Sequence, residues 1–469
     1  MNSNSPIFLF LLFISFSAFS QIELKNKIID IGTLMPIENA SIYVKNTTTG
    51  TISNVDGKFV LMVPEKYARD TLIVSSIGYK SFKTLVDEFD SSMEIFLEDD
   101  VAALDEVVLI AETRPKTGND IVLKALEELS ENMPDSAYIQ KGFVRHKERN
   151  RKEFKWLVES AITLYDSGYD TIVPEEVKIN VDQVRKSYDL RDVDSLLVYT
   201  SYLKNKNPRL KIKKQNLRRD TIKTSTLVKA IKWNDTRVNG LENLFQGKLN
   251  LLRQSGDPKA LFGEHIFENH HFELDTVLVD NDRKIYKIKI EEGFDFVDLN
   301  TKGIFNNGYK AHGWIYIYWD NYAIKKIEYE LLAASDAQKS RSKTLFDTNV
   351  GHRLEISYME FQDKMYLNYI YYETPKLVNV GDRNVNQEEV TEEERDLRFY
   401  YTVQEVLFTE IILDPELINE ALNSSWDADL FSPKPYNKEF WENYNTLLES
   451  EEDEKLIEDL TQRYSLYKD

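Results

Sequence analysis

The residues between positions 36 and 97 alternate apolar and polar side chains in short runs, and this pattern is the strongest constraint on the fold. A period of two, with β-branched and aromatic residues at the apolar positions, is typical of half-buried strands. The residues expected on buried faces are Ile42, Val44, Phe59, Leu61, Val63, Leu72, Val74, Ile95 and Leu97. Asp56-Gly57 lies between two runs and predicts a tight hairpin, because glycine adopts positive φ at no steric cost. Gly78 suits a strand end, where a Cβ atom would clash. The pattern predicts a small β-sandwich.

The same region resembles the carboxypeptidase regulatory-like domain, a transthyretin-like sandwich found at the N-terminus of Bacteroidetes envelope proteins. The resemblance covers residues 22 to about 110 and rests on Pro36, Ala40, Asp56, Gly57, Phe59, Gly78 and Tyr79. The segment Leu104–Val108 also follows this domain in TonB-dependent receptors. The resemblance implies an envelope protein in which the sandwich is a docking or spacer module. It also implies that these residues are scaffold rather than catalytic groups.

The N-terminus predicts export. Residues 6–18 form an apolar run that is too short to span a bilayer, and Ala18-Phe19-Ser20 before Gln21 has the small-x-small pattern of a cleavage site. We therefore expect a signal peptide over residues 1–20, with a signal anchor as the alternative, and a protein in the periplasm or associated with the outer membrane. The chain has no cysteine, so it forms no disulfide and cannot be a lipoprotein.

The formal net charge is −20 at pH 7, which argues against general nucleic-acid binding. The charge is uneven, because residues 204–232 hold eleven lysines or arginines and one acidic residue, Asp220. One interpretation is a site for an anionic partner, such as a lipid headgroup or a polysaccharide. Its residues would be Lys211, Lys213, Lys214, Arg218 and Arg219. The alternative, which a charge run without interleaved aromatic residues favours, is a solvated loop and strand edge.

A linker and a helix are expected over residues 112–135. Asn119 or Asp120 is the predicted N-cap, and Met133-Pro134 ends the helix. The apolar stripe of this helix is Ile121, Val122, Ala125, Leu126 and Leu129.

Residues 136–375 predict a curved antiparallel sheet that is rich in tyrosine. In the run 314–319 both alternating faces are apolar, which indicates a strongly curved sheet with something packed inside. Asp320-Asn321 then predicts a tight hairpin into residues 323–329. Two segments, within residues 121–165 and 272–317, resemble the DUF5686-like proteins, a Bacteroidetes family of unknown function. The resemblance implies the half-barrel of lipoprotein-carrier folds, in which a curved sheet wraps a helix. Longer members continue into an outer-membrane barrel, whose evenly spaced amphipathic strands are not found here, so we expect a soluble relative.

Residues 376–469 predict a charged segment followed by C-terminal helices. Tyr436, Phe440, Tyr444, Leu447 and Leu448 recur at helical spacing and predict a helix that docks on the sheet. The acidic stretch 449–459 is expected to be solvated.

Two groups of residues are candidates for chemistry. His265 and Glu268 have the HxxE spacing of metallocarboxypeptidase zinc sites, but a two-position pattern is weak. The third-ligand candidates are His270, His271, His312 and His352. His270-His271 equally suits packing at the entry to a strand.

The second group lies in one predicted strand. Arg145 and Lys147 share one face, while His146 and Glu148 share the other. A cross-strand pair with Glu159 at the rim of the half-barrel is favoured over acid–base catalysis.

The sequence as a whole predicts a mainly β protein, with a transthyretin-like sandwich followed by a curved antiparallel half-barrel and a few helices. The expected parts are 1–20 signal peptide, 21–111 sandwich, 112–135 linker and helix, 136–375 curved sheet and 376–469 charged segment with helices. We expect a non-enzymatic envelope protein, without cofactor, whose sheet domain binds an apolar or amphipathic ligand or a protein partner. The alternatives are a structural accessory of a TonB-dependent outer-membrane transporter and a zinc metallopeptidase. The oligomeric state stays open.

Overall fold

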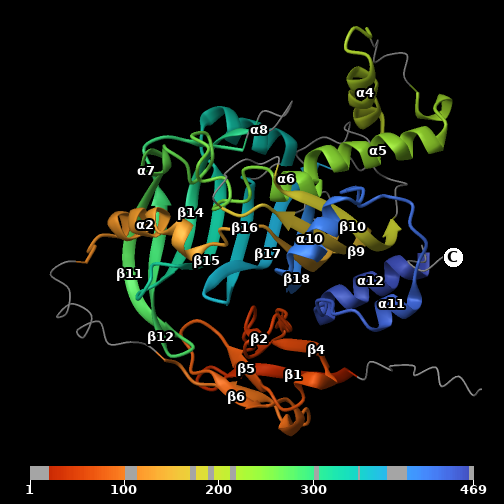
Figure 1. Cartoon of the computed structure of the whole chain (residues 1–469). Coiled ribbons are helices and arrows are strands. Elements are labelled where there is room, and N and C mark those ends of the chain that lie inside the picture. The colour runs from red at the N-terminus through yellow and green to blue at the C-terminus, as the bar shows by residue number, and fades with distance from the viewer. Residues whose placement is uncertain are drawn as a thin grey trace, which may run out of the picture.

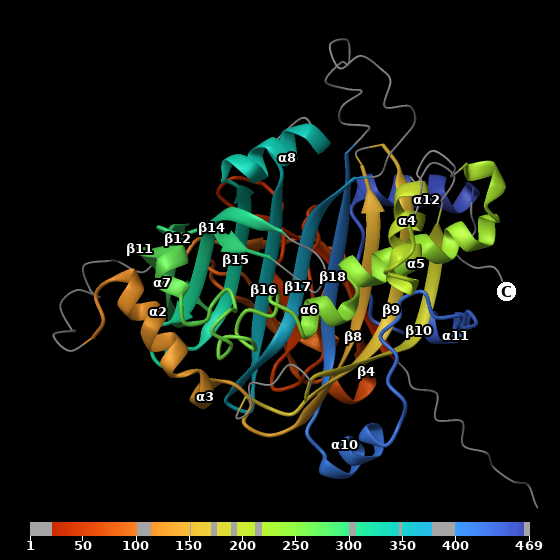
Figure 2. The same cartoon turned by 90° about the horizontal axis from the view of Figure 1, so that it is seen from above.

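The protein has three layers: a small sandwich, a large sheet, and helices on the far side of that sheet (Figure 1, Figure 2). The computed structural model describes residues 21–100, 114–150, 152–169, 176–188, 195–211, 218–299, 306–346, 349–377 and 399–463. The predicted signal peptide and the segment 104–108 lie outside these ranges. Among the described helices, none combines the length and apolar composition that crossing a membrane requires.

The sandwich, residues 21–100, consists of two facing sheets, as predicted. One has the order β4-β1-β7 and the other β3-β2-β5-β6. The strands are β1 Gln21–Asp30, β2 Ser41–Val44, β3 Gly50–Ile52, β4 Lys58–Pro64, β5 Thr71–Ser75, β6 Phe82–Leu85 and β7 Ile95–Leu97. Every residue predicted on a buried face lies in the core between the sheets. Ala40 is buried there too, Pro36 bridges to β1, and the Tyr79 hydroxyl donates to Asp30 over 3.1 Å.

The prediction of a hairpin at Asp56-Gly57 is wrong, although a turn is present there. The flanking strands β3 and β4 belong to different sheets, so the turn carries the chain across the sandwich. Asn54 shapes the turn, because its side-chain oxygen accepts from the backbone nitrogen of Asp56. Gly57 has φ 73°, and a Cβ atom there would lie 2.5 Å from the carbonyl oxygen of Ile28. The period-two pattern predicted the strands, but it carries no information about which strands pair.

The large sheet is open, curved and antiparallel, as expected. Its order is β10-β9-β8-β18-β17-β16-β15-β14-β12-β11, with β13 paired to β14. The strands are β8 Tyr138–Arg149, β9 Phe154–Asp166, β10 Lys178–Tyr188, β11 His270–Asp280, β12 Arg283–Glu292, β13 Val297–Asp298, β14 Asn307–Tyr318, β15 Ile324–Ala333, β16 Gly351–Phe361, β17 Lys364–Leu377 and β18 Phe399–Ile412. The hairpin at Asp320-Asn321 is confirmed, since β14 and β15 pair across it.

The sheet does not end at residue 375. Strand β18 lies between β17 and β8, and so joins the meander β11–β17 to the β8–β10 wing. The sequence division missed this strand because it follows the acidic stretch around residues 388–394. Its run of aromatic and β-branched residues was the available signal.

The helices are α2 Gly118–Glu127, α3 Leu129–Asn132, α4 Ser195–Lys206, α5 Thr224–Asn239, α6 Leu241–Phe245, α7 Ile266–Asn269, α8 Asp336–Phe346, α10 Pro415–Leu422, α11 Lys438–Glu442 and α12 Glu451–Arg463. The predicted cap of α2 is wrong by a few residues. Thr117 is the N-cap, and its hydroxyl accepts from the nitrogen of Asp120. Asn119 instead accepts from the nitrogen of Phe272, which ties the helix start to β11.

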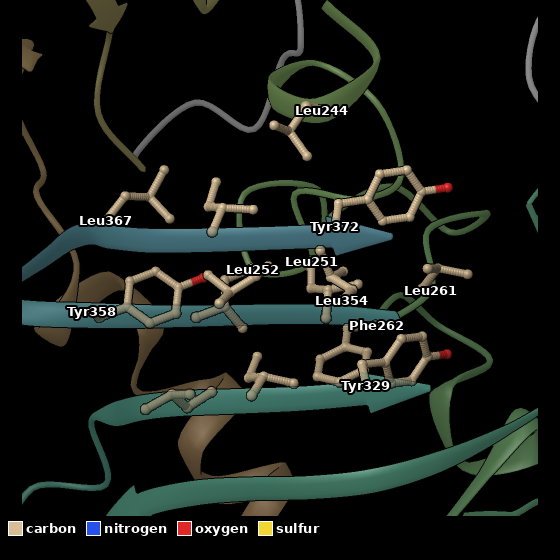
Figure 3. Close-up of a cluster of buried hydrophobic side chains, with 14 of the residues drawn as sticks. Leu244, Leu251, Leu252, Leu261, Phe262, Tyr329, Leu354, Tyr358, Leu367 and Tyr372 are labelled. Carbon is tan, nitrogen blue, oxygen red and sulfur yellow. The ribbon is translucent and has the colours of Figure 1, made fainter. Parts of the chain in front are cut away.

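We call the side of the large sheet that α2, α5 and α6 cover its inner face, and the side that faces the sandwich its outer face. The inner face is filled by the chain itself, as Figure 3 shows. Five side chains from residues 241–266 pack on strands β15, β16 and β17: Leu244, Leu251, Leu252, Leu261 and Phe262. The expectation of something packed inside the curved sheet is therefore confirmed, and the filler is a helix and a long loop of this chain.

The C-terminal region docks on the outer face, although by a shorter helix than predicted. Helix α11 ends at Glu442, and its buried residue is Trp441, which the predicted stripe did not include. Trp441 packs against Phe143 at a ring distance of 6.4 Å. The acidic stretch is not solvated throughout, because Asp453 is buried and Leu456 and Ile457 pack against Phe154 and Leu157 of β9.

Candidate functional site

A polar cleft separates the sandwich from the outer face of the large sheet. It comprises a space of about 470 Å³ and a neighbouring one of about 390 Å³, which share Glu38, Asn39, Ile52, Arg353, Glu355 and Tyr369. The sandwich, the sheet and residues 447–453 all contribute to the first space. We call these two spaces together the interdomain cleft. Their volumes are in the range of small-molecule sites, roughly 300–1,000 Å³.

A row of charged and aromatic side chains crosses the outer face of the sheet, and its members Glu405, Tyr371, Glu355 and Glu328 line the cleft. The register places the members of this row directly opposite one another on adjacent strands, from β10 to β15. In order they are Arg185, Glu159, Arg145, Glu405, Tyr371, Glu355 and Glu328. Cross-strand neighbours on one face are close enough to interact, so the row forms a ladder.

Arg145, the member of this row on β8, is almost completely buried. Its guanidinium lies 3.0 Å from Glu159 and 2.6 Å from Glu449, and it donates to the carbonyl oxygen of Leu447 over 2.7 Å. Burial alone would lower the pKa of Arg145, but the negative charges of Glu449, Glu159 and Glu405 raise it above its ordinary value. Burial alone would raise the pKa of Glu159, but the positive charges of Arg145 and Arg185 outweigh this effect and lower it. The buried charges are thus compensated, as burial in a low dielectric requires.

Lys147, two residues along β8, joins the same network. Its ammonium group lies 2.8 Å from Asp453, 3.1 Å from Glu405 and 3.6 Å from Glu449. Burial would lower the pKa of Lys147, but these three carboxylates raise it. Burial raises the pKa of Glu449 even though Arg145 and Lys147 lie beside it. For Glu405, Lys147 and Arg145 outweigh burial and lower the pKa.

The other end of the row contains two acidic residues opposite each other, Glu355 and Glu328. Like charges at this position destabilise a sheet unless a cation lies between them. Lys326 provides this cation, because its ammonium group lies 2.8 Å from the carboxylate of Glu355 and 2.9 Å from that of Glu328. Asn39 of the sandwich donates to Glu355 over 3.1 Å, so this end of the row also holds the sandwich.

A C-terminal strap, residues 445–453, runs between the sandwich and the sheet. Asn445 pairs through its side-chain amide with both backbone groups of Met62 on the edge strand β4. Asn54 donates to the carbonyl oxygen of Glu449 over 2.7 Å, and Lys58 lies 2.6 Å from Glu451. Since the strap also binds Arg145 and Lys147, it links the Asn54–Lys58 turn to β8.

The second attachment of the sandwich lies at the β11–β12 hairpin. The backbone nitrogen of Gly78, a residue with φ 88°, donates to the carbonyl oxygen of Val279 over 2.8 Å. Lys83 also lies 2.8 Å from Asp282. With the strap at one end and this contact at the other, the walls of the interdomain cleft are held on both sides.

The predicted zinc pair lies elsewhere, beside helix α7. The ring of His265 lies 2.9 Å from the carboxylate of Glu268, and more than half of each side chain is exposed. His270 points into the core, where its ring bonds the Tyr329 hydroxyl. No group of three potential ligands is found within the residues that the structure covers. The strand-entry interpretation of His270 is confirmed, because β11 begins there.

The predicted cross-strand pair of Arg145 and Glu159 is confirmed, but its predicted position is wrong. Both residues lie on interior strands in a buried network, whereas a rim position was expected. His146 lies on the face opposite Arg145, as predicted; this is the inner face, where the His146 ring lies 2.8 Å from Asp235 of α5. Its ring is fully buried, and so this pair ties α5 to the sheet.

Among the described residues, the basic stretch forms no strand edge. Lys204 and Lys206 lie on α4 and Lys229 lies on α5, while Lys211 and Arg218 lie between the two helices, as the solvated-loop interpretation predicts. We call α4, α5 and the described residues between them the α4–α5 hairpin. Lys211 and Arg218 are exposed there. Lys213 and Lys214 lie outside the described residues, and nothing is described of the Arg219 side chain.

Sequence reasoning missed the residues that line the interdomain cleft. In β17, Tyr369, Tyr371 and Glu373 alternate with inner-face residues, and in β18 Tyr401 and Glu405 do the same. A strand with an apolar inner face and an aromatic, charged outer face was the available signal. The sequence could not place the sandwich and the strap over that face.

Comparison with known proteins identifies the sandwich. Residues 24–109 match the model of the CarboxypepD_reg-like domain, which confirms the predicted regulatory-like domain. The TonB-dependent receptor SusC of Bacteroides thetaiotaomicron is 35% identical over 130 residues, which cover 27% of this chain and 12% of the receptor. The matched part is thus a small fraction of the receptor's length.

Two solved structures show a distant likeness. A LolA superfamily protein from Nitrosomonas europaea has 10% identity and a TM-score of 0.21, over 65% of this chain and 97% of that chain. A DUF1329 family protein from Desulfovibrio piger has 6% identity and a TM-score of 0.21, over 64% of this chain and 92% of that chain. The resemblance of the second half to the DUF5686-like proteins stays a prediction.

Proposed function

We propose that this protein is a non-enzymatic component of the cell envelope whose interdomain cleft binds a polar ligand. The cleft carries the proposal, because charged and tyrosine side chains from the sandwich, the sheet and the strap line a space of about 470 Å³. The CarboxypepD_reg-like domain and the similarity to a TonB-dependent receptor support the envelope location.

The side chains of the cleft favour a ligand that both donates and accepts hydrogen bonds. Arg353 is about half exposed, and its guanidinium lies 5.3 Å from the Tyr371 ring centroid. The Tyr371 hydroxyl donates to Glu373 over 2.7 Å. A guanidinium offers only donors, a carboxylate only acceptors, and the ring offers an apolar face.

An apolar ligand has less support. The inner face, its expected site, is occupied by Leu244, Leu252 and Phe262 of the chain itself. A hollow of about 560 Å³ beside α2 and α3, lined by Leu126 and Phe267 among others, is a candidate site for an amphipathic ligand.

The test is a thermal-shift screen of the full chain against polar oligosaccharides and peptides. We expect a hit whose affinity falls about tenfold or more in Arg353→Ala/Tyr371→Ala, equivalent to about 1.4 kcal/mol or more. The control is Arg69→Ala/Tyr67→Ala, the same pair of residue types on the sandwich away from the cleft. A hit that binds the cleft variant as tightly as the wild type would contradict this assignment.

The absence of enzymatic activity is part of the proposal and has its own test. The zinc peptidase alternative needs a metal on His265 and Glu268, which contact each other on the surface. We expect less than about one zinc per several purified chains, with no peptide hydrolysis. Stoichiometric zinc that is lost in His265→Ala would support the alternative.

A second candidate function is docking of the sandwich to a TonB-dependent transporter. Ile31 directly follows β1, and its backbone nitrogen donates to the carbonyl oxygen of Leu97 over 3.0 Å, which places it beside Phe96 of β7. These side chains are 56% and 47% exposed, and paired exposed apolar residues suit a protein contact. In pull-downs from envelope extracts, Ile31→Glu/Phe96→Glu should lose a transporter that the α2 control Leu123→Glu retains. Equal recovery with both variants would reject this role.

A further inference from the structure

The α4–α5 hairpin, described over residues 195–211 and 218–239, is a second surface that the cleft does not use. It stands out beyond the helix layer, at the opposite end of the molecule from the sandwich (Figure 1). Tyr202 of α4 packs edge-on against Trp233 of α5 at a ring distance of 5.5 Å, which joins its two arms. His146 and Asp235 anchor α5 to the sheet. The hairpin is thus a fixed projection.

Its exposed surface is strongly cationic within an acidic protein. The exposed cations are Lys204, Lys206, Arg209, Lys211, Arg218, Lys223 and Lys229. Among the residues that the structure describes, Asp220 is the exposed acid of this region, and no carboxylate lies within 4.0 Å of those seven cations. The chain as a whole has a net charge of −20. The α4–α5 hairpin therefore carries a concentration of exposed positive charge that no nearby carboxylate of the described residues neutralises.

The arrangement of these residues fits a surface better than a pocket. Leu210 is 39% exposed and lies between Arg209 and Lys211, so an apolar side chain sits among cations. At a membrane, apolar side chains enter the boundary between headgroups and acyl chains, while lysine and arginine extend to the phosphates. The acidic remainder of the protein is repelled by an anionic surface, which favours contact through the hairpin.

We propose that the α4–α5 hairpin binds the surface of a membrane that contains anionic phospholipids. Binding in this orientation directs the sandwich away from the membrane. The inference is independent of the interdomain cleft, since no residue of the hairpin lines it.

The experiment uses the full chain and vesicles of phosphatidylcholine, with or without phosphatidylglycerol, in a co-sedimentation assay. The test variant is Arg209→Glu/Lys211→Glu/Arg218→Glu. The matched control, Lys45→Glu/Lys66→Glu/Arg69→Glu, makes the same change in net charge at exposed positions of the sandwich. All exchanged side chains are exposed, so both variants keep the fold, which circular dichroism verifies.

We expect the wild type and the control to sediment with the anionic vesicles and not with pure phosphatidylcholine. Each cation near an anionic surface contributes roughly fivefold to partitioning, so losing three weakens binding by on the order of 100-fold. Binding should also fall as salt rises from about 0.1 M to 1 M, because the Debye length shortens from about 10 Å to 3 Å.

Three outcomes would overturn the proposal. Equal loss in the control would show an effect of net charge alone. Full competition by soluble glycerol phosphate, at the phosphate concentration of the vesicles, would indicate a free phosphate site. Retention on heparin without vesicle binding would assign the hairpin to a soluble polyanion.

Discussion

At the scale of single residues, this protein buries charge where apolar packing would have sufficed. Arg145 is 3% exposed and contacts carboxylates from β9 and from the strap. A buried ion pair adds little stability over an apolar replacement, but removal of one partner leaves an uncompensated charge. The main effect of the network is therefore to determine which segments pack over β8, and its contribution to the stability of the fold is smaller.

The first prediction concerns Arg145. Arg145→Met leaves Glu159 and Glu449 buried without their shared cation, and we expect the free energy of unfolding to fall by about 3–5 kcal/mol. Urea denaturation measures it. Lys25→Met, which removes an exposed pair with Glu23, is the control and should cost no more than about 1 kcal/mol. A loss as small as that of the control would show that the network is not compensating buried charge.

The second prediction concerns pH. Burial lowers the pKa of His270 and of His352 from 6.5 to about 4. Protons therefore bind the unfolded chain more readily, and stability is lost as pH falls from the unfolded pKa of 6.5 towards about 4. At pH 5 each histidine should cost about 2 kcal/mol relative to pH 7.

Urea denaturation at pH 7 and pH 5 measures this loss. His352→Gln should have a smaller drop between the two pH values than the wild type. The exposed His265→Gln should keep the wild-type drop. An unchanged pH dependence in His352→Gln would contradict the assignment.

At the scale of elements, residues 241–266 decide what the curved sheet can do. A curved sheet with an empty inner face would be a carrier, but here Leu251, Leu252 and Phe262 occupy that face (Figure 3). Helix α5 brings the segment there, because Asp235 on this helix is held by His146 of β8. Long loops are uncommon in compact domains unless they have such a role.

The third prediction tests this packing. Leu252 is fully buried, so Leu252→Ala should lower the free energy of unfolding by about 2–5 kcal/mol through lost burial and the cavity left behind. Leu123→Ala on the exposed side of α2 is the control, and its loss should be within about 0.5 kcal/mol. The wild type should not take up a fluorescent apolar probe on the inner face. Stoichiometric uptake that Leu252→Phe blocks would contradict the filled inner face.

At the scale of the whole molecule, the strap and the β11–β12 hairpin hold the sandwich against the sheet from two sides. The strap also shields the edge strand β4, since Asn445 uses its amide to pair with Met62 as a neighbouring strand would. The geometry of the interdomain cleft consequently depends on a segment far from the sandwich in sequence.

The fourth prediction removes the strap contacts. In Asn54→Ala/Lys58→Ala/Asn445→Ala, the backbone amide of Met62 loses its acceptor, so its hydrogen exchange should accelerate by about tenfold or more. The radius of gyration from solution scattering should also rise. Lys80→Ala, which breaks an exposed pair with Glu98 within the sandwich, is the control and should change neither quantity. Unchanged exchange at Met62 in the triple variant would show that the strap does not hold β4.

Local patterns in the sequence determined much of the fold. Alternation of apolar residues predicted the strands of the sandwich and its core, because burial of one strand face leaves a period of two. The same logic predicted the curved sheet and the opposite faces of Arg145 and His146. The sandwich was also identifiable from its motifs, since turn residues such as Gly57 have a local steric reason.

The candidate site depended on contacts between segments far apart in sequence. Glu449 and Asp453 belong to a stretch that local reasoning places in solvent, yet Asp453 is buried beside Lys147 and Glu449 is largely covered beside Arg145. Nothing in an acidic run indicates that cations over 300 positions away will neutralise it.

The sequence by itself thus determined that this chain has a regulatory-like sandwich, a curved sheet and a concentrated basic stretch, because each has a periodic or compositional signature. Only the tertiary structure decided that the chain fills its own inner face, that a polar cleft lies on the other side, and that the basic residues project on a helical hairpin. Those outcomes are set by packing and charge compensation between distant segments, which leave no local pattern.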